Sequence, residues 1–260
     1  MLQVNMQSGG CLGLTLATVR KEVIGNATLY LGDFFELIAQ GVIPEKSVDS
    51  VVSSPPFIAE DLGLVTDEEY YEWYAGLLAK LEPLVADYAL LFNSNTRLYD
   101  ITQRFCPYGR PLIWDKFRGQ APYRYEPIFI HRMSKARFDI TNSIFTDCYH
   151  YESVDKAKMV HPYENPLEIY ERWLINILAF REGEKFTRTI LDPFMGSGKT
   201  LLACNNLGLK SIGFEINPDY FEIAVETIRN GEGSCTAHLG TRQRIKSALQ
   251  QQKLTEAIPV

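Results

Sequence analysis

The chain has 260 residues, of which 46% are hydrophobic, so it is long and apolar enough to bury one sizeable core. Its 26 Lys and Arg residues against 32 Asp and Glu give a net charge of −6, which excludes a uniformly basic coat for nucleic acid but allows a local basic groove. Five scattered cysteines without a Cys-x-x-Cys pair argue against a disulfide scaffold or a cysteine-based zinc site. No apolar run approaches the roughly 18 residues of a membrane span, and Met1–Gly10 lacks the pattern of a signal peptide.

Along the chain, β-type apolar runs alternate with segments of helical periodicity. The expected strands are Thr28–Leu31, Val48–Ser53, Tyr88–Phe92, Pro111–Trp114, Pro127–His131, Thr189–Leu191 and Ser211–Phe214. The expected helices are Phe34–Gln40, Asp67–Val85 (capped by Thr66), Pro166–Phe180, Lys199–Leu207 and Asp219–Arg229. This alternation predicts an α/β fold with a mostly parallel sheet and helices on both faces.

Four turn segments follow expected strands directly: Gly32-Asp33, Ser54–Phe57, Asp192–Gly198 and Glu215. In parallel α/β sheets, ligands bind at the carboxyl ends of the strands. We therefore expect these four segments to meet at one edge of the sheet and to form a site.

The glycine-rich segment Gly196-Ser-Gly-Lys-Thr200 has two interpretations. It resembles the end of a phosphate-binding P-loop, but that motif needs a glycine where this chain has Pro193, which lacks an N–H for phosphate. The favoured interpretation is a cofactor loop, in which Gly196 and Gly198 let the backbone approach an uncharged nucleoside-like ligand. Glu215, after the next strand, would then accept hydrogen bonds from two ribose hydroxyls.

The turn Ser54-Pro-Pro-Phe57 is unusual for a simple connection. Two prolines fix the backbone, so the Ser54 side chain and the Pro55 carbonyl form a rigid pair of acceptors, with the flat Phe57 ring beside them. This arrangement suits an exocyclic amino group on a planar base.

These segments carry a family resemblance. Ser54–Phe57 resembles the catalytic motif of the amino-group DNA methyltransferases, which methylate N6 of adenine or N4 of cytosine. Asp192–Gly198 resembles their S-adenosylmethionine loop, and Glu215–Tyr220 their ribose-binding motif. The catalytic turn precedes the cofactor loop, as in the circularly permuted beta class, so the resemblance implies a Rossmann-like S-adenosylmethionine-dependent methyltransferase fold. It covers roughly residues 28–230.

The resemblance also implies residue roles. The target base leaves the DNA stack, Ser54 and Pro55 accept hydrogen bonds from its amino group, and Pro56 and Phe57 complete the catalytic turn. Asp33 would bind the cofactor's adenine amino group, and Ile216 would pack on the adenine ring. The remaining expected cofactor residues are Asp192, Phe194, Gly196, Gly198, Thr200 and Glu215. There are two departures from the family pattern: Asn165 replaces a lysine, and Val85-Ala-Asp87 replaces a Lys-Pro-Gly-Gly lead-in, a change expected to affect only a turn.

The target base and the substrate class are less sharply defined. Ser rather than Asp at the first position of the turn favours N4 of cytosine, with N6 of adenine as the alternative, since both bases present an amino donor. More distant alternatives are an RNA or protein-amide methyltransferase, an inactive nucleic-acid-binding module and a P-loop-like nucleotide hydrolase.

We expect one methyltransferase domain over residues 1–260, with a catalytic half (28–131), a short target-recognition insert (132–160), a cofactor half (161–230) and a polar tail (231–260). Basic residues near aromatics predict DNA contacts from Arg118, Arg124, Lys135, Arg137, Lys156 and Lys158, although a solvated loop explains those in the insert equally well. So short an insert suggests a short or relaxed target site. The implied partner is double-stranded DNA without a membrane, in a bacterial or phage-encoded cytoplasmic protein. A homodimer and a cognate restriction enzyme are compatible with this assignment, and no metal is expected.

Overall fold

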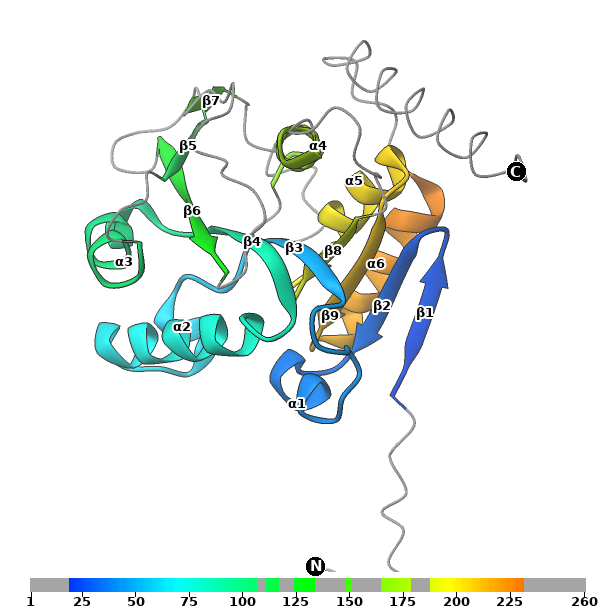
Figure 1. The fold of residues 1–260 in the computed structure, drawn as a ribbon, viewed down its shortest axis with the longest axis horizontal. Coiled ribbons are helices and arrows are strands. Elements are labelled where there is room, and N and C mark those ends of the chain that lie inside the picture. Colours follow the sequence, from blue (N-terminus) through cyan, green and yellow to red (C-terminus); the bar gives the residue numbers. More distant parts are fainter. Residues whose placement is uncertain are drawn as a thin grey trace, which may run out of the picture.

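The computed structural model describes residues 19–106, 111–116, 124–133, 148–150, 165–178 and 188–231 (Figure 1). Within these residues one sheet has the strand order β1-β2-β9-β8-β3-β4-β6-β5-β7. The strands are β1 (Lys21–Ile24), β2 (Ala27–Leu31), β3 (Val48–Ser53), β4 (Val85–Phe92), β5 (Leu112–Asp115), β6 (Tyr125–Arg132), β7 (Cys148–His150), β8 (Thr189–Asp192) and β9 (Lys210–Glu215). The helices are α1 (Phe34–Ala39), α2 (Asp67–Leu81), α3 (Leu98–Phe105), α4 (Leu167–Leu178), α5 (Lys199–Leu207) and α6 (Pro218–Asn230), with 3-10 turns η1 (Ala59–Leu62) and η2 (Asn95–Arg97).

The centre of the sheet is parallel and its margins are mixed. Strands β2, β9, β8, β3 and β4 pair in parallel, whereas β1 pairs antiparallel with β2, and β6 antiparallel with both β4 and β5. This confirms the predicted mostly parallel sheet. Because parallel strands end at the same edge, the turns after β2, β3, β8 and β9 are brought together.

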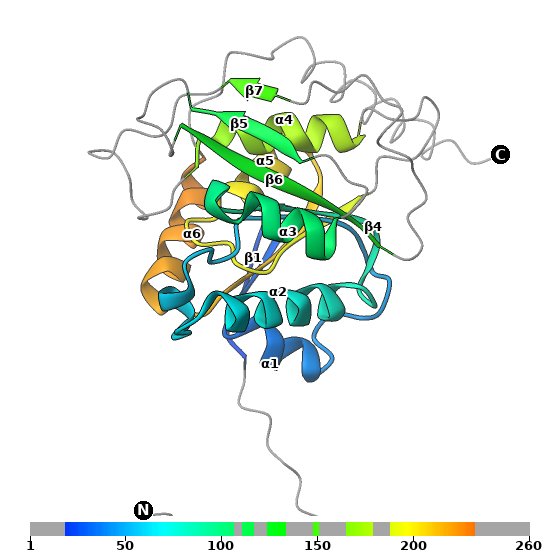
Figure 2. The same cartoon turned by 90° about the vertical axis from the view of Figure 1, so that its left-hand side faces the viewer.

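The sheet separates two hydrophobic layers, which explains why most residues of its central strands are buried on either face. One layer packs α4, α5 and α6 against alternate strand residues such as Val52 and Ile190. The other packs α1, α2 and α3 against the intervening residues, such as Val51 and Leu191. In Figure 2, α1 and α2 lie at the bottom of the view and α4 near the top. None of the described helices combines the length and apolarity needed to cross a bilayer.

Helix α2 begins as the sequence predicts and ends earlier than expected. The Thr66 side chain accepts from the Glu69 amide, and the Glu69 carboxylate accepts from the Thr66 amide, which is a complete capping box. The helix stops at Leu81 rather than Val85, because Pro83 follows and cannot donate to a continuing helix.

The departure at residues 85–87 affects more than a turn, contrary to expectation. Val85–Asp87 form the start of β4, and Asp87 is fully buried. Its carboxylate pairs with Arg188 Nη1 at 3.3 Å, just before β8. The ion pair therefore links β4 to the cofactor half of the sheet. The sequence analysis also did not predict β1, α3 or β7, which are short elements of four, eight and three residues.

Candidate functional site

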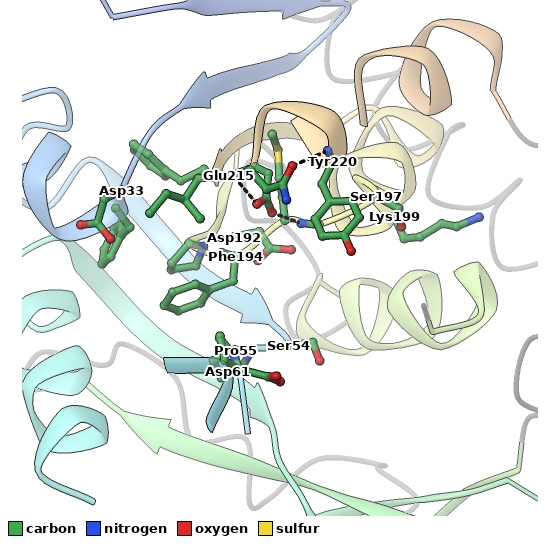
Figure 3. A pocket seen from close by; sticks show the side chains of 18 of the residues that line it. Asp33, Ser54, Pro55, Asp61, Asp192, Phe194, Ser197, Lys199, Glu215 and Tyr220 are labelled. Carbon is green, nitrogen blue, oxygen red and sulfur yellow. Dashed lines mark hydrogen bonds between the residues drawn. The ribbon is translucent and has the colours of Figure 1, made fainter. Parts of the chain in front are cut away.

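The four turns predicted to meet line one cavity of about 500 Å³ at the carboxyl edge of the sheet. Figure 3 shows Ser54 and Pro55 on one side, Glu215 on the other, and Asp192 with Phe194 between them. Five charged residues line the cavity, four of them acidic: Asp33, Asp61, Asp192, Glu215 and the single lysine Lys199. An acidic cavity of this size suits a cationic ligand and disfavours phosphate.

In the glycine-rich loop after β8, three successive backbone amides donate hydrogen bonds to acceptors within the protein. The Phe194 amide donates to Asp192 Oδ1 (3.1 Å), that of Met195 to the Phe214 carbonyl (2.9 Å), and that of Gly196 to Glu215 Oε2 (3.0 Å). A P-loop instead presents such amides to phosphate oxygens. Here a carboxylate occupies that position, so the loop is not built for a nucleotide phosphate.

Glu215 ends β9 with its carboxylate held on both oxygens. Oε2 accepts from Gly196, and Oε1 accepts from the Asn217 amide at 2.8 Å. Burial raises the pKa of this carboxyl. Each oxygen retains a further lone pair, so Glu215 can still accept from two ligand hydroxyls.

The two residues expected to contact the adenine of the cofactor, Ile216 and Asp33, line the same cavity as Glu215. Ile216 is 66% exposed and lines the cavity, which leaves an apolar side chain free to cover a ring. Asp33 also lines the cavity, and its Oδ1 caps α1 by accepting from the Glu36 amide at 2.9 Å. The Gly32 amide donates to the Glu215 carbonyl at 2.8 Å, which joins the ends of β2 and β9.

Two residues expected at the cofactor lie behind the cavity wall. Gly198 has φ of 80°, and a Cβ there would lie 3.0 Å from Ala224 Cβ, so glycine at this position permits the close packing of α5 on α6. Thr200 is buried within α5 and does not line the cavity. Phe194 and Gly196 do line it.

The cavity floor is a buried polar group centred on Asp192, which is 2% exposed. Ser53 Oγ donates to Asp192 Oδ1 at 2.6 Å, and burial raises the pKa of this carboxyl to about 6. Asn165 Nδ2 donates to Tyr170 Oη at 3.2 Å beside it. Sequence reasoning passed over Ser53, although a serine pointing to the opposite side of the strand from Ser54 was a usable signal.

The catalytic-turn candidates face the cavity with their acceptors available. Ser54, Pro55, Pro56 and Phe57 all line it. Within the described part of the chain, neither Ser54 Oγ nor the Pro55 carbonyl has a hydrogen-bond partner, whereas the next two carbonyls do. Sequence reasoning also missed other lining residues, namely Asp61, Ser197, Lys199 and Tyr220.

Of the residues proposed for DNA contact, only Arg124 lies among the described residues. It is exposed and makes a bidentate pair with Asp115, Nε to Oδ1 and Nη2 to Oδ2, each at 3.0 Å. Its guanidinium is thus already engaged. Arg118, Lys135, Arg137, Lys156 and Lys158 lie outside the described residues, as do most of the expected insert and nearly all of the tail.

Known DNA methyltransferases are similar to this chain in sequence. Residues 112–226 match the model of the N6/N4 DNA methylase family. Type II methyltransferase M.HpaI of Haemophilus parainfluenzae is 24% identical over 72% of this chain and 69% of its own length. Type II methyltransferase M.ScaI of Streptomyces caespitosus is 23% identical over 84% of this chain and 88% of its own.

Solved structures share the fold. The cytosine-N4-specific PvuII DNA methyltransferase matches with a TM-score of 0.62 and 17% identity, over 88% of this chain and 93% of that one. The complex of M1.HpyAVI with S-adenosylmethionine matches with a TM-score of 0.55 and 23% identity, over 78% and 99%. The fold is therefore that of the S-adenosylmethionine-dependent methyltransferases. In sequence, residues 112–226 are similar to the N6/N4 DNA methylases, and the two curated relatives are Type II methyltransferases.

Proposed function

We propose that this protein transfers a methyl group from S-adenosylmethionine to N4 of a flipped cytosine in double-stranded DNA. The observation that carries the proposal is the pair of free acceptors, Ser54 Oγ and the Pro55 carbonyl, on a proline-fixed turn that shares one acidic cavity with the glycine loop and Glu215.

The donor set fits S-adenosylmethionine. Glu215 would hold the ribose hydroxyls, Ile216 would cover the adenine ring and Asp33 would accept from the adenine amino group. Phe194 and Gly196 would flank the methionine portion, while Asp192 shapes the loop through the Phe194 amide. The excess of carboxylates in the cavity favours a sulfonium cation. When bound, this cofactor supplies an electrophilic methyl group.

The chain's own residues act on the amino group. A nitrogen conjugated to its ring is a poor nucleophile, because its lone pair is delocalised. Ser54 Oγ and the Pro55 carbonyl would accept hydrogen bonds from its two N–H groups, draw it towards tetrahedral geometry and stabilise the positive charge that develops on it. Once methylated, the nitrogen would release one of its protons to water. The rigid turn places these acceptors before the base arrives, so little of this orientation has to be achieved during the reaction.

The preference for cytosine is supported by Ser54 at the first position of the turn. The same two acceptors would also serve the amino group of adenine, so adenine is the alternative outcome of the test. Because the curated relatives are Type II methyltransferases, we include in the proposal a cognate restriction enzyme with the same target sequence. The short insert between β6 and α4 supports a short target site.

Product analysis tests the proposal directly. The protein is incubated with S-adenosylmethionine and unmethylated DNA, the DNA is digested to nucleosides, and the products are identified by mass spectrometry. N4-methyldeoxycytidine supports the proposal, and N6-methyldeoxyadenosine would show that the target base is adenine. Methylation of RNA or protein instead of DNA would overturn it.

A further inference from the structure

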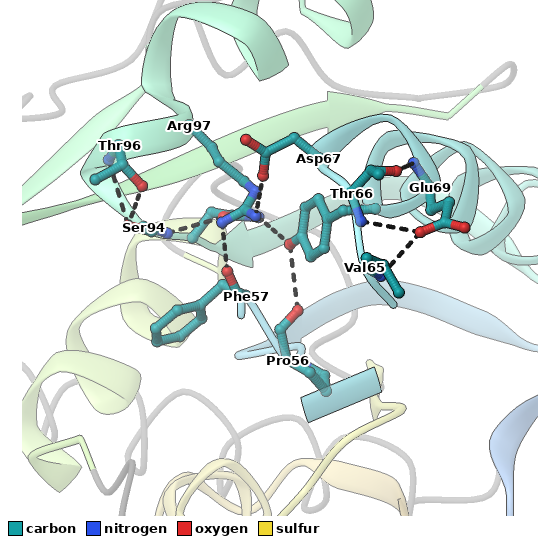
Figure 4. Close-up of polar contacts among 11 residues, drawn as sticks. Pro56, Phe57, Val65, Thr66, Asp67, Glu69, Ser94, Thr96 and Arg97 are labelled. Carbon is teal, nitrogen blue, oxygen red and sulfur yellow. Dashed lines mark hydrogen bonds and ion pairs between the residues drawn. The ribbon is translucent and has the colours of Figure 1, made fainter. Parts of the chain in front are cut away.

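The carbonyl oxygens of the catalytic turn are divided between the cavity and the protein interior. The Pro56 carbonyl accepts from Tyr70 Oη at 3.2 Å, and the Phe57 carbonyl accepts from Arg97 Nη1 at 2.7 Å (Figure 4). The Pro55 carbonyl has no such donor within the described residues. Two outside donors therefore hold the end of the turn and leave one carbonyl for the substrate.

We propose that Tyr70 and Arg97 are positioning residues that fix the orientation of the Ser54–Phe57 turn and so keep the Pro55 carbonyl aimed at the target amino group. This inference rests on the proposed function of that turn. Neither side chain lines the cavity, so each would act through the backbone of the turn and not by contact with substrate.

Tyr70, in α2, is locked in its donor role. Asn93 Nδ2 donates to Tyr70 Oη at 2.8 Å, and the Asn93 amide is itself oriented because its Oδ1 accepts from the Ser94 amide at 2.8 Å. Since an amide nitrogen can only donate, the Tyr70 proton is directed to Pro56. Burial raises the pKa of Tyr70 to about 12, so the hydroxyl keeps that proton at ordinary pH.

Arg97, at the end of η2, is held on three sides. Its Nη2 pairs with Asp67 Oδ1 at 2.5 Å, and its guanidinium carbon lies 4.1 Å from the centre of the Tyr70 ring. The side chain is 12% exposed. A planar guanidinium fixed by an ion pair and an aromatic face can direct Nη1 to one place, which here is the Phe57 carbonyl.

The chain contains a matched pair that does not reach the turn. Arg104, in α3, makes a bidentate pair with Glu68 of α2 and lies 4.4 Å from the centre of the Tyr71 ring. Arg104 with Tyr71 thus repeats the arrangement of Arg97 with Tyr70 one residue further along α2. Arg104→Lys is therefore a control for the loss of an arginine guanidinium. Tyr71→Phe is a control for the loss of a tyrosine hydroxyl from α2.

The test compares Tyr70→Phe and Arg97→Lys with these controls. Both positioning variants should lower the single-turnover rate of methyl transfer to DNA about tenfold or more, while the dissociation constant for S-adenosylhomocysteine stays within about twofold of the unsubstituted protein. The control variants should stay within about twofold of the unsubstituted rate. Unchanged rates in both positioning variants, or an equal fall in the controls, would overturn the inference. If the unsubstituted protein transfers no methyl to DNA, it is the proposed function that fails.

A second measurement does not depend on activity. Pro-Phe occurs twice in the chain, at 56–57 and 193–194, so labelling proline carbonyls with ¹³C and phenylalanine amides with ¹⁵N gives one NMR signal from each turn. Tyr70→Phe and Arg97→Lys should shift the 56–57 signal and leave the 193–194 signal in place. A 56–57 signal that does not move in either variant would refute the positioning role, whatever the substrate of the enzyme.

Discussion

Ser53 and Ser54 are neighbours in the sequence with different environments. Side chains alternate along a strand, so Ser53 turns inward and donates to Asp192, whereas Ser54 reaches the cavity at the strand's end. One hydroxyl therefore orders the floor of the site, and the other is available to a ligand. Their substitution should have different consequences.

Ser54→Ala should lower the single-turnover rate of methyl transfer about 100-fold, because one of two acceptors for the developing positive charge is lost. Binding of S-adenosylhomocysteine should be retained, since the cofactor residues come from other strands. Ser47→Ala is a suitable control, because among the described residues the Ser47 hydroxyl donates a hydrogen bond only to the nearby Pro44 carbonyl. A Ser54→Ala protein with full activity would remove Ser54 from the mechanism.

Asp192 predicts a pH dependence of stability. Burial raises its pKa to about 6 in the folded protein, against about 3.9 in an unfolded chain. Between these values the folded state holds a proton that the unfolded state has lost, so the free energy of unfolding falls as pH rises from about 4 to 6. Two pKa units correspond to about 3 kcal/mol lost by pH 7.

Asp192→Asn should remove this loss while its side-chain oxygen still accepts from Ser53. In urea unfolding at several pH values, the stability of the variant relative to the unsubstituted protein should rise by about 3 kcal/mol between pH 4 and 7. Glu226→Gln, at an exposed position of α6, serves as the control. A difference that stays constant with pH would contradict the buried carboxylate described here.

The sequence predicted best which single residues line the cavity where a rare local pattern marked them. Two successive prolines after a strand identified Ser54 and Pro55. Glu215 was identified by its position at the end of the strand that follows the glycine-rich loop. Thr200 and Gly198 belonged to the same motif, but packing places them behind the wall, which no local pattern reveals. The sequence also did not predict the roles of Tyr70 and Arg97, because their hydrogen bonds to the turn join residues 14 and 40 positions apart.

At the scale of elements, strand β9 must pass close beneath the cofactor loop. A Cβ on Gly213 would lie 2.5 Å from Met195 Sδ and 2.8 Å from a methyl carbon of Leu201. Met195 can shift, but Leu201 is fully buried in the core. Glycine at this position therefore sets how near the loop can come to the sheet.

Gly213→Ala should destabilise the protein by about 1–3 kcal/mol through overpacking. It should also weaken cofactor binding, because the Met195 amide donates a hydrogen bond to the Phe214 carbonyl and so holds the loop to β9. Calorimetric titration with S-adenosylhomocysteine and urea unfolding measure both effects. Gly76→Ala is the control: it lies within α2 with no atom near the added Cβ, and alanine there should stabilise the helix. Unchanged cofactor binding in Gly213→Ala would show that the loop does not depend on this close approach.

Most of the central elements were predictable, because each combines a periodic apolar pattern with a clear start or stop. Thr66, expected to cap α2, is such a signal and does cap that helix. The end of α2 was mispredicted because apolar residues continue at helical spacing into Val85, and only Pro83 marks the break. Helix α3 was not predicted because it has only eight residues, although Leu98, Ile101 and Phe105 recur in it at helical spacing.

At the scale of the whole molecule, the cavity lies where strands from distant parts of the sequence meet, because β8 and β9 lie between β2 and β3 in the sheet. Strand β3 pairs with β8 at Ser50–Ile190 and Val51–Leu191. Such pairing between segments about 140 residues apart cannot be read from local patterns. The order of the motifs implied the fold class and did not predict this pairing. Beyond the strands, aromatic contacts join such segments, since the Trp73 ring of α2 lies 5.8 Å from the Phe194 ring of the cofactor loop.

This contact should make Trp73 an optical reporter of the cofactor. Phe194 lines the cavity, so a ligand against the loop changes the surroundings of Trp73, whereas Trp114 is buried in β5 without lining the cavity. Adding S-adenosylhomocysteine should change the tryptophan emission of the unsubstituted protein and of Trp114→Phe, and Trp73→Phe should lose most of that change. An undiminished response in Trp73→Phe would mean that the ligand is sensed elsewhere, and that the aromatic contact does not couple the catalytic half to the occupied cofactor loop.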